Sequence, residues 1–131
     1  MAKKKAVRPL TPLELEIMKI LWASGPATVQ SVHQHIQRVR PLAYNTVQTV
    51  LTILHRKGSV KRVMEQRAYL YSPAVTQERT AVQALRDLVD RLFGGRPEAL
   101  VLSMVKSRQL TLEQLSELRN MVDEGDEHGG R

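Results

Sequence analysis

The sequence contains no cysteine and few aromatic residues, and both absences narrow what the chain can be. None of its 131 residues is cysteine, and aromatic residues make up only 4% of them. The lack of thiols excludes a disulfide framework, a thiolate metal site and a cysteine nucleophile. The scarcity of large rings favours small packed helices over an aromatic-rich β-sandwich. The length suits one compact domain or two small ones.

Long apolar runs and catalytic motifs are missing as well. No stretch approaches the ~20 apolar residues needed to cross a bilayer, and residues 1–10 lack the apolar segment of a signal peptide. We therefore expect a cytoplasmic protein without membrane insertion. The sequence has no glycine-rich phosphate loop and no Ser/His/Asp pattern, and His33 and His35, two residues apart, point to different faces of a helix. We predict no enzyme, no cofactor and no metal site.

Positive charge is in excess, and it is concentrated in the first part of the chain. Residues 1–75 hold 12 Lys and Arg against 3 Asp and Glu, whereas residues 76–131 hold 8 against 10. A basic part joined to a slightly acidic part indicates that the first meets a polyanion and that the second has another task. The alternative interpretation is an uneven distribution of solvated charge.

Three helices are predicted in the basic part. Residues 11–14, Thr-Pro-Leu-Glu, have the form of a capping box with proline at the first helical position, and the apolar stripe that follows ends near residue 23. Thr28 caps a second, shorter helix. A turn over residues 38–42 leads to a third helix, which starts near residue 43 and stops at Gly58. The predicted apolar face of this helix consists of Val47, Val50, Leu51 and Leu54.

A short hairpin is predicted directly after the third helix. Residues 59–63 and 68–71 are β-prone and flank a polar tip over residues 64–67. The tip lacks an Asn-Gly signal, which leaves the register open. Three short helices followed by a hairpin are the layout of a winged helix-turn-helix, expected over residues 10–75 after a flexible basic arm over residues 1–9. The fold class is therefore mainly α with a small β-hairpin.

The remaining chain is predicted to be helical, with helices over residues 76–93 and 97–107. A third helix is predicted to open with a second capping box over residues 111–114, Thr-Leu-Glu-Gln. A disordered tail is expected over residues 123–131. Three helices of this size bury too little surface to be stable alone, so we expect residues 76–122 to dimerise with a second copy. The alternative is that they fold back on the first domain. The expected dimer contacts are Val82, Leu85, Val89, Leu92, Leu100, Val101, Met104, Leu115 and Leu118.

The outer face of the third helix carries uncharged hydrogen-bonding side chains. At helical spacing along this face lie Asn45, Gln48, Thr49, Thr52 and Arg56. Asn and Gln pair bidentately with adenine, and threonine offers a hydroxyl and a methyl group to thymine. The face therefore suits base edges in a major groove, where the start of this helix enters first in helix-turn-helix proteins. Asn45 and the neighbouring Thr46 have a second interpretation, which is capping of the helix.

Flanking residues complete the predicted DNA contacts. Tyr44 either stacks on the sugar–phosphate backbone or packs locally. Lys61, Arg62 and Arg67 on the hairpin suit phosphates or the minor groove, or they only solubilise the strands. The alternative function is an RNA-binding or protein-interaction module, because one fold serves several functions.

The first helix, the third helix and the hairpin together form a recognisable pattern. Their sequences LTPLELEIMKILW (residues 10–22), AYNTVQTVLTILHRKG (residues 43–58) and RAYLYSP (residues 67–73) resemble the BlaI/MecI family of penicillinase repressors. VLSMVKSRQLTLEQLSEL (residues 101–118) resembles the dimerisation region of that family. The resemblance implies a homodimeric transcriptional repressor that covers a palindromic operator in double-stranded DNA.

The resemblance also implies how repression ends. In family members that control β-lactam resistance, a membrane-bound sensor protease triggers cleavage within the C-terminal domain, and the loss of dimerisation releases the operator. The matching bond here lies near Ser103–Met104, where those repressors have an Asn-Phe pair. Cleavage or loosening of the C-terminal arm is therefore the expected means of relief.

Overall fold

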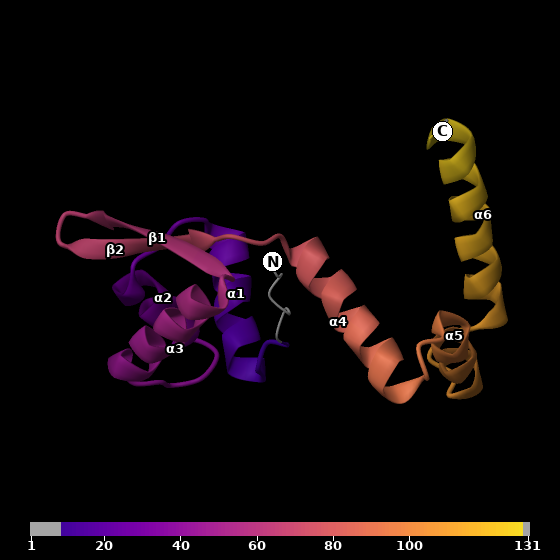
Figure 1. Ribbon diagram of the computed structural model, residues 1–131, viewed down its shortest axis with the longest axis horizontal. Helices are drawn as coiled ribbons and strands as arrows, with labels where there is room; N and C mark the ends of the chain where they lie inside the picture. The colour runs from indigo at the N-terminus through magenta and orange to yellow at the C-terminus, as the bar shows by residue number, and fades with distance from the viewer. Residues whose placement is uncertain (1–8, 130–131) are drawn as a thin grey trace, which may run out of the picture. The chain divides into compact units, whose positions relative to one another are not determined.

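The computed structural model describes residues 9–129 of the chain, with side chains through residue 125. Within these residues, helices and strands follow one another as in Figure 1. Their bounds are α1 Pro12–Ser24, α2 Val29–Ile36, α3 Tyr44–Lys57, β1 Val60–Glu65, β2 Ala68–Pro73, α4 Gln77–Leu92, α5 Pro97–Lys106 and α6 Leu112–Gly129. The predicted fold class, mainly α with a small β-hairpin, is confirmed. The basic arm expected over residues 1–9 lies almost wholly outside the described residues.

The chain forms two compact units, divided between Leu85 and Arg86 inside α4. The first contains α1 to β2 and the start of α4, and the second contains the rest of α4 with α5 and α6. A domain boundary after residue 75 therefore stays a prediction. None of the helices in the described part of the chain is long and apolar enough to cross a membrane.

Local side-chain bonds explain where the first two helices begin. The Thr11 hydroxyl oxygen accepts the Glu14 N–H at 3.2 Å, and Glu14 Oε1 accepts the Thr11 N–H at 3.0 Å. This is the predicted capping box. The Thr28 hydroxyl oxygen accepts the Ser31 N–H at 3.1 Å and so caps α2, as expected. Gly58 ends α3 in the left-handed conformation, φ 87°, which glycine adopts without a steric penalty.

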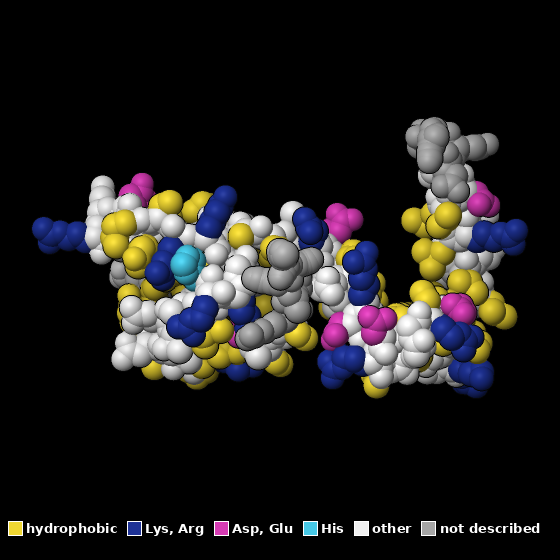
Figure 2. All heavy atoms as spheres, in the orientation of Figure 1, with side chains coloured by type: hydrophobic (Ala, Val, Ile, Leu, Met, Phe, Trp, Pro, Cys, Tyr) yellow, Lys and Arg dark blue, Asp and Glu magenta, His cyan; other side chains and the backbone are white. Residues whose placement is uncertain are grey.

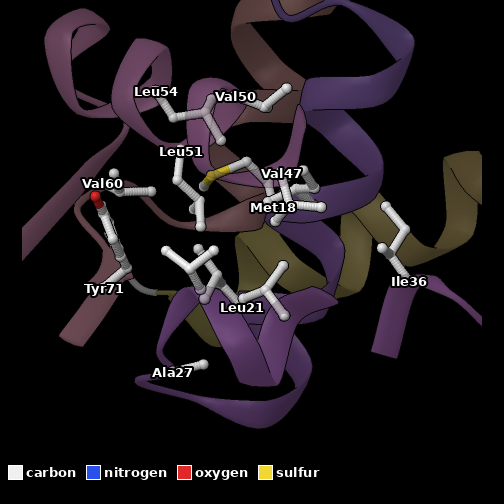
Figure 3. Close-up of a cluster of buried hydrophobic side chains, with 13 residues drawn as sticks. Met18, Leu21, Ala27, Ile36, Val47, Val50, Leu51, Leu54, Val60 and Tyr71 are labelled. Carbon is white, nitrogen blue, oxygen red and sulfur yellow. The ribbon is translucent and has the colours of Figure 1, made fainter. Parts of the chain in front are cut away.

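One hydrophobic core lies within the first unit. The apolar faces of α1, α2 and α3 meet there beneath the hairpin, and Figure 3 shows the side chains from these elements converging. The predicted apolar face of α3 is confirmed, and α1 adds Met18, which the periodicity had not picked out. The buried residues are Ile17, Met18, Leu21, Ala27, Val29, Val32, Ile36, Val47, Val50, Leu51, Leu54, Val60 and Tyr71. Each large apolar side chain contributes roughly 1.5–3 kcal/mol on burial.

The two strands pair antiparallel, from Val60 with Pro73 to Glu65 with Ala68. The tip expected over residues 64–67 is wrong by two residues, because only Gln66 and Arg67 form the turn. Both have positive φ, 51° and 71°, the geometry that matches the twist of a two-residue hairpin. Pairing therefore continues to the turn, although neither residue is glycine. Figure 1 shows the hairpin projecting beyond α2 and α3.

The second unit consists of helices with little interior. Its one buried large apolar side chain among the described residues is Val89. Thr111 and Gln114 bond to each other's backbone N–H at 3.0 Å, which confirms the second predicted capping box. The disordered tail expected over residues 123–131 is wrong as far as Gly129, because α6 continues to that residue. Gly125 lies inside α6 and does not adopt the positive φ with which many helices end.

Candidate nucleic-acid interface

The outer face of α3 is exposed, uncharged and polar over its first two turns. Asn45, Thr46, Gln48 and Thr49 are all exposed, and their neighbour Val47 is fully buried. No residue of α3 is acidic, and its last turn carries His55, Arg56 and Lys57. The structure therefore brings the predicted contact residues of this helix together on one accessible face.

Capping does not explain Asn45 and Thr46. The residue before the helix is Ala43, which has extended backbone and no side-chain cap bond. Asn45 and Thr46 are the second and third residues of α3, inside the helix, so the capping interpretation is wrong. Thr52 differs from the others, since it is half-buried and its hydroxyl donates to the Gln48 carbonyl at 3.0 Å. Its proton is therefore already used within the helix.

Two side chains hold the turn before α3: His33 of α2, and Gln37, the residue directly after α2. The Leu42 N–H donates to Gln37 Oε1 at 2.7 Å, and His33 Nε2 lies 2.7 Å from the Leu42 carbonyl oxygen. These two bonds fix the backbone at Leu42, just before the helix. The start of α3 is therefore held in place although Ala43 provides no side-chain cap. The ring of His33 also meets Tyr44 edge to face, with centroids 5.8 Å apart. Tyr44 thus packs locally and still leaves 44% of its surface exposed.

Sequence periodicity did not identify His33 and Gln37 as positioning residues. They stand four residues apart at the end of α2, and that spacing places them on one helix face. This spacing was the only signal in the sequence that could have linked the two residues. It does not reveal their shared partner Leu42, which is nine residues after His33 and five after Gln37.

The hairpin does not bring its three predicted basic residues together. Lys61 and Arg62 are adjacent in β1, so they point to opposite faces, and Arg67 lies at the turn. The Arg62 guanidinium stacks 4.0 Å from the centre of the Tyr69 ring, which holds it on the face that continues into the core. Lys61 and Arg67 are exposed. Figure 2 shows Lys and Arg side chains spread over the first unit, whereas most of the visible Asp and Glu side chains lie over α4 to α6.

At the end of α3, two adjacent basic residues have different surroundings. Arg56 is exposed. Lys57 Nζ lies 2.7 Å from Glu14 Oε1, and the two side chains are only 17% and 7% exposed. Arg56 is therefore available to a phosphate, whereas Lys57 ties α3 to the start of α1.

A second surface of interest is the apolar side of α4, α5 and α6. Of the predicted dimer contacts, Val82, Leu85, Leu92, Val101 and Leu118 are exposed, Leu100, Met104 and Leu115 are half-buried, and Val89 is buried within its own chain. Further exposed apolar residues, which the sequence analysis had not selected, are Leu88, Leu102, Leu112, Met121 and Val122. Ser103 and Met104 both lie within α5. Among the described residues, no group of three or more His, Asp or Glu is placed to hold a metal ion.

Known proteins resemble this chain over most of its length. Residues 10–124 match the family model described as penicillinase repressor. The chain is 24% identical over 111 residues to the penicillinase repressor of Staphylococcus aureus, across 85% of this chain and 88% of that protein. It is 37% identical over 95 residues to the transcriptional regulator BlaI of Mycobacterium tuberculosis, across 70% of this chain and 69% of that protein.

A solved structure is similar to part of this chain. The DNA-binding domain of the repressor BlaI has a TM-score of 0.51 and 26% identity, over 56% of this chain and 90% of that domain. The winged-helix layout predicted from the order of helices and hairpin is therefore confirmed. Together with the family match over residues 10–124, this confirms the resemblance found in the sequence: the chain belongs to the penicillinase repressor family.

Proposed function

We propose that this chain is a sequence-specific DNA-binding repressor that acts as a homodimer on a two-fold symmetric operator. The observation that carries the proposal is the outer face of α3, which is exposed, neutral and rich in hydrogen-bonding groups. The chain's similarity to the penicillinase repressor of Staphylococcus aureus and to the DNA-binding domain of the repressor BlaI supports the proposal. The proposed function is binding rather than catalysis. A DNA ligand implies that the protein acts in the cytoplasm.

Base recognition is assigned to the start of α3. Gln48 and Asn45 suit the N6 and N7 atoms of adenine, and Thr49 suits the thymine methyl group. The α3 backbone is held from behind by the buried Val47 and from its start by the bonds at Leu42. A rigidly held helix presents these side chains in a defined register, which is what discrimination between bases requires.

Phosphate contacts are assigned to the basic residues around this face. Arg56 at the end of α3 and Lys61 and Arg67 on the hairpin are exposed, and Arg62 is half-buried with its guanidinium stacked on Tyr69. Such contacts position the protein on the duplex without reading sequence. Because each neutralised phosphate releases counterions, they make binding strongly dependent on salt.

Dimerisation is assigned to the exposed apolar side chains of α4, α5 and α6. Leu92, Leu112 and Met121 are 70%, 71% and 63% exposed, which is costly for apolar groups in water. A partner of the same kind would cover them. One winged domain binds DNA non-specifically with a dissociation constant of roughly 10⁻⁴–10⁻⁶ M, and joining two strengthens binding by ~10²–10⁴-fold.

Relief of repression follows from the same arrangement. Loosening or cutting the arm removes the gain from dimerisation and releases the operator, and a membrane-bound sensor protease is one such regulator. The Ser103–Met104 bond lies in α5, where the Ser103 carbonyl oxygen accepts the Ser107 N–H at 2.9 Å. A protease acting there would have to unwind α5 first, because proteases bind an extended chain.

The test of base recognition compares two substitutions on two kinds of DNA. Selection from a random duplex library with the full chain defines the preferred site. Gln48→Ala and Thr49→Ala should each weaken binding to that site by roughly 1–3 kcal/mol, about 5- to 150-fold, and leave binding to random duplex nearly unchanged. Asn120→Ala, a neutral polar side chain exposed on α6, is the matched control and should alter neither.

Two outcomes would reject this assignment. Equal losses on selected and random duplex would mean that the α3 face supplies affinity without reading bases. A preference for structured RNA over duplex DNA at matched salt in a filter-binding assay would reject the DNA ligand itself.

A further inference from the structure

The short connection between β2 and α4 is tied down at each residue. Ala74 donates its N–H to the Ser59 carbonyl oxygen at 2.8 Å. The Val75 carbonyl oxygen accepts the indole N–H of Trp22 at 2.9 Å. Thr76 caps α4, because its hydroxyl oxygen accepts the Arg79 N–H at 3.0 Å. All three bonds lie within the first unit.

Of these three bonds, the one from Trp22 joins the residues that lie furthest apart in the sequence. Trp22 stands near the end of α1, 53 residues before its partner, and its half-buried ring packs against the core. The Val75 side chain packs against the same core. Trp22 and residues 73–77 also line a shallow surface depression. The connection contains no glycine, so nothing in it offers a free hinge.

We infer that Trp22 is a positioning residue that restricts the spacing between half-sites which the dimer accepts. The inference rests on the proposed dimeric function. Two winged domains joined by flexible connections tolerate many separations between half-sites, whereas stiff connections select one. Trp22 stiffens the connection at its middle residue, after which α4 begins. If the Trp22 indole only satisfied its own N–H, its loss would change stability and not the preferred spacing.

The experiment uses the full chain and duplex probes built from its selected half-site. One series carries two inverted half-sites whose separation grows in single base pairs over about one helical turn, and one duplex carries a single half-site. The wild-type protein should bind one separation at least about tenfold more tightly than separations a few base pairs away.

The main variant is Trp22→Phe, which keeps an aromatic ring in the core and removes the indole donor. It should bind all separations within about twofold of one another and bind the single half-site as the wild type does. A second variant carries one glycine inserted between Val75 and Thr76. It leaves the Trp22 bond in place, loosens the chain after it, and should show the same loss of spacing preference.

The matched control is Ser24→Ala. It removes a side-chain hydrogen bond to the Ile20 carbonyl near the same end of α1, without touching the connection. It should keep the wild-type preference.

The inference is overturned if Trp22→Phe keeps that preference, or if it weakens single half-site binding as much as paired binding. A wild-type protein that selects no paired half-sites would instead refute the proposed dimeric function, so the two failures are distinguishable.

Discussion

At the scale of single residues, Glu14 joins two structural tasks in one carboxylate. Its Oε1 atom accepts the Thr11 N–H that opens α1 and also pairs with Lys57 Nζ at the end of α3. Both charges are largely withdrawn from water, with side chains 7% and 17% exposed. Such a buried pair matters for stability mainly because removal of either side chain leaves the other charge buried without a counter-charge.

Lys57→Met is therefore expected to lower the free energy of unfolding by about 3 kcal/mol, because it leaves the Glu14 carboxylate buried without its counter-charge. The measurement is urea unfolding of the full chain at a fixed protein concentration, since association also shifts apparent stability. Lys19→Met removes an exposed lysine of α1 and should change stability by less than about 0.5 kcal/mol.

The double variant Glu14→Gln, Lys57→Met separates charge from capping. Glutamine still accepts the Thr11 N–H, and no buried charge remains, so stability should return to within about 1 kcal/mol of the wild type. If Lys57→Met cost no more than Lys19→Met, the pair would be exposed in solution and the energetic account would fail.

At the scale of elements, the hairpin turn holds two ordinary residues in a conformation that suits glycine. Gln66 and Arg67 have φ of 51° and 71°, and a left-handed residue with a Cβ costs roughly 1–2 kcal/mol. Such strain in a projecting turn is consistent with a side chain retained for binding. Arg67 is that side chain under the proposed function.

Arg67→Gly should accordingly raise stability and weaken binding at once. Relief of the left-handed strain, less the added freedom of the unfolded chain, predicts a gain of about 0.5–1 kcal/mol in thermal or urea unfolding. Loss of one phosphate contact should weaken operator and random duplex alike and reduce the salt slope by about 1.

Gln66→Gly is the matched control for the turn. It relieves the same kind of strain without removing charge, so stability should rise while the salt slope stays unchanged. A destabilised Arg67→Gly protein would show that the turn is not strained.

Much of the secondary structure could be predicted because its signals are local. The capping boxes at Thr11 and Thr111 and the apolar period of α3 each lie within a few residues. The hairpin turn could not be placed, because Gln66 and Arg67 carry none of the usual signals for positive φ.

The contacts that orient the candidate site could not be predicted either. The bonds from His33 to Leu42 and from Trp22 to Val75 join residues whose proximity depends on the folded chain. The α3 face was accessible to sequence analysis because it follows from periodicity alone. Its exact starting point was not, since Ala43 offers no cap.

At the scale of the whole molecule, apolar surface is distributed unequally between the two units. The hydrophobic core cluster lies entirely in the first unit, whereas the second exposes Leu92, Leu112 and Met121. A unit with so small an interior gains stability from association. Under the proposed function, single apolar substitutions in the second unit should therefore change the oligomeric state.

Leu92→Glu should convert the protein to a monomer, because a charge replaces an apolar side chain at the proposed contact. Light scattering or sedimentation should give the chain mass of 14.9 kDa for the variant and twice that for the wild type. Binding to paired half-sites should fall by ~10²–10⁴-fold, with single half-site binding retained.

Lys106→Gln makes the same change of net charge at an exposed position of α5 and should stay dimeric. A wild-type monomer at micromolar concentration, or a dimeric Leu92→Glu protein, would contradict the proposed interface.

The chain contains a single tryptophan, and it is Trp22. Its indole is half-buried and bonded to the connection that leads into α4. Intrinsic fluorescence excited at the indole therefore reports on this one place, without labels and without interference from a second emitter. A red shift or a change in quenching when DNA is added would reveal whether the connection loosens as the protein binds, in the unmodified protein and in real time.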